Sequence, residues 1–214
     1  MVAFAVEDDR WMVTVGGYHH DRPRADAADF AARIADEPAA AIHRFAHDAE
    51  PLTDVATHRY PAGVRREFHR LARFPGGLVA LGDSVASFNP IYGQGMSSAA
   101  IQAGTLQKFL AGGAPPSEPA SDYFKRLRPV VESVWRLSAT ADFRLDHVTG
   151  DKPPGLWLTH KVTKLYTRAT LRDAKSHRRF LRVVNLQEPP EALLRPRALL
   201  RAVRVSRRPL PPAV

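Results

Sequence analysis

Residues 78–110 constrain the fold of this 214-residue chain more than any other stretch. The run Leu78-Val79-Ala80-Leu81 is apolar throughout, as in a strand buried on both faces, and it stops at Gly82-Asp83. After a loop, few residues between Gly93 and Leu110 would break a helix, and Gly112-Gly113 stand in the position of a C-terminal cap. Met96, Ala100, Ala103 and Leu106 fall on one stripe of that helix. The order of strand, loop and helix is typical of an open α/β sheet.

Such sheets bind ligands beyond the carboxyl ends of their strands, which is where Asp83 lies. The Asp83 carboxylate can accept hydrogen bonds from sugar-type hydroxyls. Gly93 and Gly95 remove side chains where a ligand would lie against the backbone. The helix start adds unpaired N–H groups and a positive dipole end, which together favour a cofactor that becomes anionic.

The spaced pattern over these residues resembles the third FAD motif of the aromatic-hydroxylase class of flavoprotein monooxygenases, which includes p-hydroxybenzoate hydroxylase-like and polyprenyl-methoxyphenol hydroxylase-like enzymes. The matching residues are Gly82, Asp83, Pro90, Gly93, Gln94, Gly95 and Met96. The resemblance implies that Asp83 binds the ribityl chain. It also implies that Pro90 and the segment Gly93 to Met96 face the pyrimidine side of the flavin ring. The chain departs from the family at Ala86 and Ser97, where a His and an Asn are common.

The same resemblance implies an FAD-dependent oxidoreductase that uses NAD(P)H and oxygen to hydroxylate an aromatic or prenylated small molecule. The flavin performs that chemistry, so no catalytic acid or base is assigned. A flavin reductase acting on isoprenoid double bonds is the nearest alternative among enzymes. An alternative of another class is a non-catalytic, basic, membrane-associated remnant.

The thirteen glycines include no GxGxxG after a strand near the N-terminus, the pattern that cradles a dinucleotide pyrophosphate. We therefore expect the C-terminal portion of a flavoenzyme, which by itself binds FAD poorly. The predicted fold is α+β, as part of an α/β FAD-binding fold. We expect residues 1–75 to form a piece of substrate-covering antiparallel sheet. Residues 76–112 would be the last strand and helix of the FAD domain, and residues 113–214 a helical C-terminal region.

Local patterns predict the elements outside this motif. Alternating and β-branched residues favour a hairpin from strands 2–6 and 11–15, and a further strand at 55–60. Residues 26–49 have helical spacing that Pro38 breaks into two pieces. The remaining predicted helices cover about 121–147, 155–176, 177–186 and, interrupted by proline, 191–206.

Several other chemistries find little support in the sequence. Gly82-Asp83-Ser84-Val85 resembles the nucleophile block of GDSL-type esterases, but no Asp stands three residues before a His and no Gly-x-Asn-Asp block is present. His43 and His47 are spaced i,i+4 without a third ligand, so no metal site is predicted. The chain has no cysteine, which excludes disulfides and thiolate chemistry and suits a reducing cytoplasm.

The net charge of +9 has a specific location in the sequence. After Glu191 the chain has six arginines and no acid, and Arg197, Arg201, Arg204 and Arg208 fall on one helical face. The face from Arg195 to Arg208 suits peripheral contact with an anionic membrane surface, or it is a solvated face whose leucines pack inward. No recognition motif or interleaved aromatic set accompanies the arginines, so nucleic acid is not a predicted partner. No apolar run approaches the length of a bilayer span.

Overall fold

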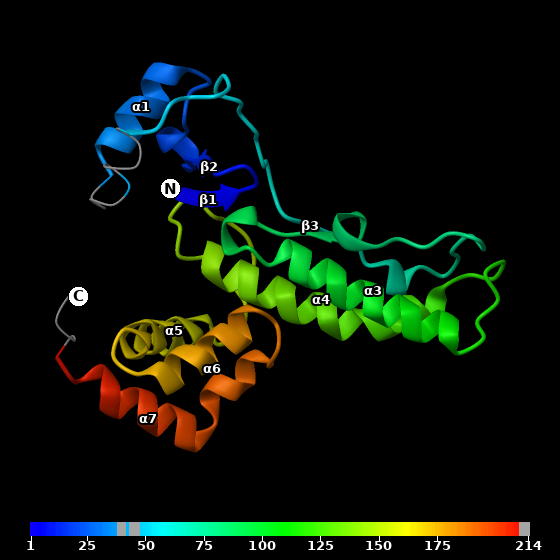
Figure 1. Cartoon of the computed structure of the whole chain (residues 1–214). Coiled ribbons are helices and arrows are strands. Elements are labelled where there is room, and N and C mark those ends of the chain that lie inside the picture. The colour runs from blue at the N-terminus through cyan, green and yellow to red at the C-terminus, as the bar shows by residue number, and fades with distance from the viewer. Residues whose placement is uncertain (38–41, 43–47, 210–214) are drawn as a thin grey trace. The chain divides into compact units, whose positions relative to one another are not determined.

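A computed structural model of the chain describes residues 1–37, 42 and 48–209 (Figure 1). The fold is mixed, with helices and small antiparallel sheets, as the α+β prediction requires. It divides into two compact units, residues 1–59 and the chain from Tyr60 onward. The boundaries predicted after residues 75 and 112 both fall inside the second unit.

The first unit contains the predicted hairpin. Strands β1 (Val2–Val6) and β2 (Arg10–Thr14) are antiparallel, with Val2 opposite Thr14 and Val6 opposite Arg10. Asp8 and Asp9 turn the chain with φ of 61° and 55°, the left-handed pair that a tight hairpin turn needs. The hairpin prediction is therefore confirmed, with the second strand shifted by one residue.

Helix α1 (Ala27–Ala35) is the first piece of the predicted helical stretch. Asp26 begins it, because its carboxylate accepts a hydrogen bond from the Asp29 N–H at 2.6 Å. Most of the second predicted piece, including His43 and His47, lies outside the described residues.

The second unit is built mainly from helices. They are α3 (Gly95–Ala111), α4 (Ser121–Asp142), α5 (Leu156–Thr170), α6 (Ala174–Val184) and α7 (Pro196–Ser206). A short antiparallel pair, β3 (Val64–Arg65) with β4 (Ala86–Ser87), precedes them. All of the predicted C-terminal helices are present, and the last is a 3-10 turn (Pro190–Leu194) followed by α7.

Two predicted strands are not formed. Residues 55–60 and 78–81 are irregular, and Leu78 and Leu81 are 54% and 39% exposed. A strand buried on both faces needs paired neighbours and covering layers, and no described strand pairs with 78–81. The segment is instead tied to α4, where the Tyr123 hydroxyl donates to the Ala80 carbonyl at 3.3 Å.

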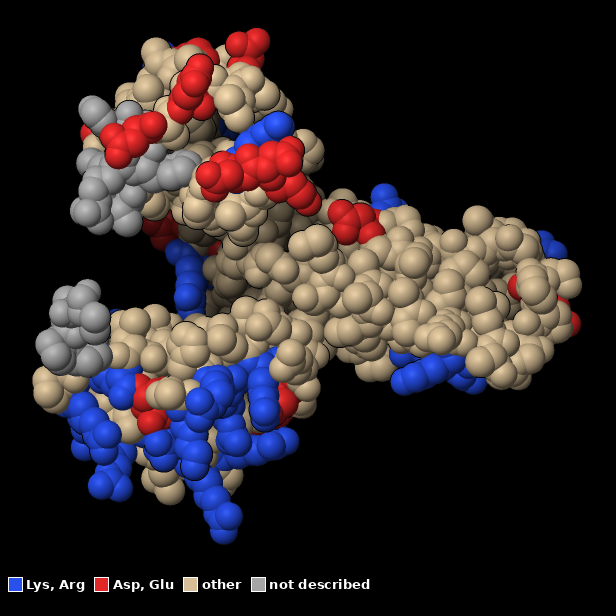
Figure 2. Space-filling model, viewed as in Figure 1, with Lys and Arg blue, Asp and Glu red and all other residues tan. Residues whose placement is uncertain are grey.

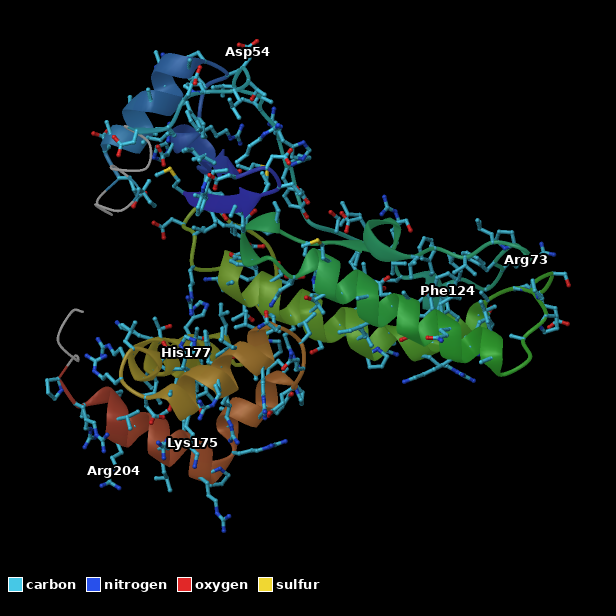
Figure 3. All side chains as sticks on the ribbon, viewed as in Figure 1. Asp54, Arg73, Phe124, Lys175, His177 and Arg204 are labelled. Carbon is cyan, nitrogen blue, oxygen red and sulfur yellow. The ribbon has the colours of Figure 1, made fainter. Side chains whose placement is uncertain are left out.

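Two apolar cores organise the second unit. In the first, the ring of Phe124 of α4 lies 5.1 and 4.7 Å, between centroids, from the rings of Phe68 and Phe74. Phe124 is labelled in Figure 3. The second joins α5, α6 and α7, and its Tyr166 hydroxyl donates to the Leu193 carbonyl at 3.0 Å. No helix in the described part of the chain combines the length and apolarity that a membrane span requires.

Candidate flavin-facing site

The Gly-Asp motif forms a 3-10 turn, Gly82–Ser84, that packs against α3. Gly82 has φ of +63°, in the left-handed region that favours glycine. Its N–H donates to the side-chain carbonyl of Gln102 at 2.9 Å. The turn is thereby attached to the helix that begins with the second half of the motif.

Helix α3 buries polar side chains where the sequence suggested an apolar stripe. Gln102 and Ser98 have no exposed surface, and the Gln102 amide nitrogen donates to the Ser98 hydroxyl at 3.1 Å. Met96, by contrast, is 86% exposed, and Ala100 and Ala103 are exposed as well. Burial of these two polar side chains carries little free-energy penalty, because each forms a hydrogen bond.

Asp83 is exposed, and its carboxylate forms no hydrogen bond or ion pair with any described residue. Only its backbone carbonyl is engaged, by Arg66 at 3.4 Å. A carboxylate in this state has all its acceptor positions available to a ligand. The pKa of Tyr60 is raised mainly by burial of the phenol, and the negative charge of Asp83 raises it further.

The proline loop is a second 3-10 turn, Pro90–Tyr92, held from the far end of α4. Asp142 Oδ1 accepts hydrogen bonds from Asn89 Nδ2 and from the Tyr92 hydroxyl, both at 2.8 Å. The Asn89 side chain also caps the turn, accepting from the Ile91 N–H at 3.2 Å. Pro90 lies exposed on this anchored loop.

The start of α3 is open. Gly93 ends the proline turn with φ of +65°, which accounts for a glycine there. Gly95 is different: its φ is not left-handed, and a Cβ built on it would have no neighbour within 4 Å. Neither backbone conformation nor packing within the described residues requires a glycine at position 95. The first N–H groups of the helix have no partner inside it, and Gln94 provides no side-chain cap.

The Gln94 side chain, unlike the start of α3, is buried. It is 94% buried, and its amide nitrogen donates to the Val184 carbonyl at the end of α6, at 3.3 Å. Its Oε1 atom is buried with no hydrogen-bond partner among the described residues. The Gln94 side chain therefore links the residue before α3 to the end of α6.

The hydroxyl of Ser84, the nucleophile of the esterase alternative, forms hydrogen bonds within the turn. It donates to the Leu81 carbonyl at 2.6 Å and accepts from the Leu81 N–H at 2.9 Å. Across the described residues no group of three metal-ligating side chains is found.

The structure therefore brings the two halves of the motif onto one helix. Gly82 and Asp83 dock near Gln102, and the segment from Gly93 to Met96 leads into the same helix, which begins at Gly95, about 10 Å away along its axis. Sequence reasoning missed Gln102 and Asp142, which hold the turn and the loop. Their partners lie 20 to 53 residues away, so no local pattern indicates them.

A separate small pocket lies between residues 65–69 and α4, and contains none of the predicted site residues. Its volume of about 20 Å³ suits one water molecule. His69 Nε2 is buried beside it without a hydrogen-bond partner among the described residues.

Comparison with known proteins gives a relative whose name states no activity. The chain is 34% identical over 155 residues to Protein Rv3254 of Mycobacterium tuberculosis (strain ATCC 25618 / H37Rv). The match covers 71% of this chain and 32% of the relative, so the chain spans about a third of the relative's length. No protein-family model matches the sequence.

Proposed function

We propose that residues 60–112 are the flavin-facing part of an FAD-dependent oxidoreductase of the monooxygenase class, acting on an aromatic or prenylated small molecule with NAD(P)H as reductant. The observation that carries the proposal is the partly buried hydrogen bond from Gly82 to Gln102. It fixes the Gly-Asp turn on the same helix whose open start contains Gly93 and Gly95.

The residues present fit the flavin half of FAD. The unpaired, exposed carboxylate of Asp83 would accept hydrogen bonds from ribityl hydroxyls. Gly95, which nothing among the described residues requires to be glycine, would let a flat ring approach the backbone. The amide-rich start of α3 would stabilise negative charge on that ring by about 0.3–1 kcal/mol.

FAD, when bound, would supply the electron transfer between NAD(P)H and oxygen or substrate. The chain's own part would be to hold and orient it. Asp142, through Asn89 and Tyr92, would keep the proline loop in place beside the ring. The Gln94 side chain would take no part in binding, because it is bonded to Val184 on another helix.

The surface around the motif supports a further packing partner, which we propose is the remaining, dinucleotide-binding part of the flavin domain. Just before the motif, Leu78, Val79 and Leu81 are 54%, 36% and 39% exposed, and Met96 at its end is 86% exposed. Large exposed apolar side chains near a candidate site are often covered by other structure. That part would hold the adenosine and pyrophosphate.

Because we propose that this chain holds only the flavin half of FAD, we can predict how the chain alone should bind flavins. If Asp83 and α3 hold only the ring and ribityl chain, then riboflavin, FMN and FAD should bind weakly and within about threefold of one another. Quenching of flavin fluorescence during titration with the purified chain measures all three.

Asp83→Asn should weaken binding of each flavin by about tenfold or more, since a hydrogen bond to a charged group contributes about 1.5–3 kcal/mol. The matched control is Asp122→Asn, an exposed carboxylate on α4. Absence of saturable quenching by any flavin would refute the site. FAD binding far tighter than riboflavin would refute the assignment of only the flavin half to this chain.

A further inference from the structure

The helices α5 to α7 concentrate the positive charge of the chain. Residues 156–209 contain 14 Lys and Arg against three Asp and Glu, a net charge of +11, whereas the rest of the chain sums to −2. Figure 2 shows the Lys and Arg side chains gathered over the region that α6 and α7 occupy in Figure 1.

The three acids of this region are already paired. Asp173 accepts from Arg201 through both oxygens, at 2.5 and 2.8 Å. Glu188 lies 3.3 Å from Arg182 and 3.8 Å from Arg195, and Glu191 pairs with Arg136. The predicted arginine face is thus partly neutralised, because Arg201 belongs to an internal ion pair.

On α6, on α7 and directly after α7, six exposed cations have no ion pair among the described residues. We call them the basic face: Lys175, Arg178, Arg197, Arg204, Arg207 and Arg208. Figure 3 marks Lys175 on α6 and Arg204 on α7. The bridge between Asp173 and Arg201 links the start of α6 to the middle of α7. Uncompensated like charges repel one another, so this surface favours an anionic partner.

Apolar side chains lie among these cations. Leu200 is 70% exposed, and on α7 it is three residues after Arg197 and four before Arg204, so it shares their helical face. Leu181 on α6 is 40% exposed and follows Arg178 by three residues. The inward face of α7 is filled separately by Ala198, Ala202 and Val205, so Leu200 is not needed for the core.

We propose that the basic face binds the surface of an anionic lipid bilayer, with Leu200 inserted among the acyl chains. Cations around a protruding leucine match the headgroup and hydrocarbon layers of a membrane interface. A nucleic acid would engage the cations but would leave Leu200 without a favourable contact, and α7 has no aromatic side chain for base stacking. This inference does not depend on the flavin proposal.

Co-sedimentation of the whole chain with phosphatidylcholine vesicles, with and without phosphatidylserine, tests the proposal. Binding should need phosphatidylserine and should weaken as salt is raised. Arg197→Glu with Arg204→Glu should reduce it by about 25-fold or more, since each cation near such a surface contributes about fivefold. Leu200→Ser should reduce binding by about tenfold, through loss of the buried apolar side chain.

The matched control is Arg73→Glu with Lys108→Glu, which changes the net charge equally at exposed cations outside α5 to α7. It should lose much less binding than the α7 variant. Circular dichroism checks that all variants remain folded. The proposal is overturned by equal binding to vesicles without phosphatidylserine, by an equal loss in the control, or by no loss in Leu200→Ser. Tighter binding to duplex DNA than to vesicles, unaffected by Leu200→Ser, would also overturn it.

Discussion

The side-chain carbonyl of Gln102 accepts a hydrogen bond from the N–H of Gly82, twenty residues earlier in the chain, at 2.9 Å. Gln102 is fully buried, and its amide nitrogen is used by Ser98. This single side chain therefore positions the Gly-Asp turn on α3.

Replacement of Gln102 should be costly for that reason. Gln102→Leu keeps the approximate volume but leaves the Gly82 N–H and the Ser98 hydroxyl without partners, which should lower the free energy of unfolding by about 1–3 kcal/mol. Urea denaturation measures the change. Gln107→Leu, at an exposed position on the same helix, is the control and should change little. Equal effects of the two substitutions would contradict the role of the hydrogen bond.

Gly95 offers a way to separate binding from folding. Gly95→Ala should leave the fold intact or stabilise it by about 0.4–1 kcal/mol, because neither φ nor a neighbour opposes a Cβ. The same methyl group should weaken flavin binding at least severalfold if the ring lies against this backbone. Gly104→Ala, later in α3 and equally unobstructed, should stabilise without changing flavin affinity. Thermal unfolding and flavin titration of both variants decide the matter.

Tyr123 should make the stability of the fold sensitive to alkaline pH. Burial raises its pKa from an ordinary value of 10.0 to about 12, so the folded state retains a proton that the unfolded state has lost. The contribution is complete below pH 10 and disappears as the pH rises toward 12. Tyr123→Phe should remove this part of the pH dependence. Urea unfolding of both proteins at a series of alkaline pH values gives the comparison.

Asp173 should have the opposite dependence, at acid pH. The hydrogen bonds from Arg201 hold the pKa of this carboxyl well below its ordinary 3.8, with smaller help from Ser176. The ion pair therefore stabilises the fold above that value, and this is lost as the pH falls through the lower pKa of the folded state.

Asp173→Asn keeps a good N-cap but removes the charge. At neutral pH it should cost about 1–2 kcal/mol of unfolding free energy, because Arg201 remains partly hydrated. The difference from the unaltered protein should shrink below about pH 4. Asp122→Asn, in an exposed pair with Lys125, should show almost no effect at either pH.

The sequence was informative where local chemistry decides structure. Asp8 and Asp9 tolerate the left-handed turn of the hairpin, and Gly112 and Gly113 close α3, with Gly113 at φ of +80°. Each of these signals acts within a few residues. The positions of these elements could therefore be predicted within one or two residues.

The predicted strand at 78–81 failed because its evidence was not local. An apolar run becomes a buried strand only when it pairs with other strands, and no described strand pairs with residues 78–81. The same segment is exposed at Leu78 and Leu81. The Gly-Asp turn that follows this segment packs on α3.

The outward stripe of α3 was unpredictable for a related reason. Amphipathic spacing suggests that Met96 and Ala100 face inward, yet Ser98 and Gln102 are the buried residues. Gln102 is hydrogen-bonded to Gly82 and to Ser98, and the contact with Gly82 cannot be predicted from the periodicity of the helix. Asp142, which anchors Asn89 and Tyr92 from about 50 residues away, is hidden from sequence reasoning in the same way.

The uneven distribution of charge, +11 in residues 156–209 and −2 elsewhere, has a kinetic consequence. A concentrated cluster of positive charge is drawn toward an oppositely charged surface before the two come into contact. Within roughly 10 Å of a negative surface, the screening distance of ordinary buffers, α7 would lead the approach. Encounters would then start from a single orientation, and added salt would slow arrival more than it hastens departure.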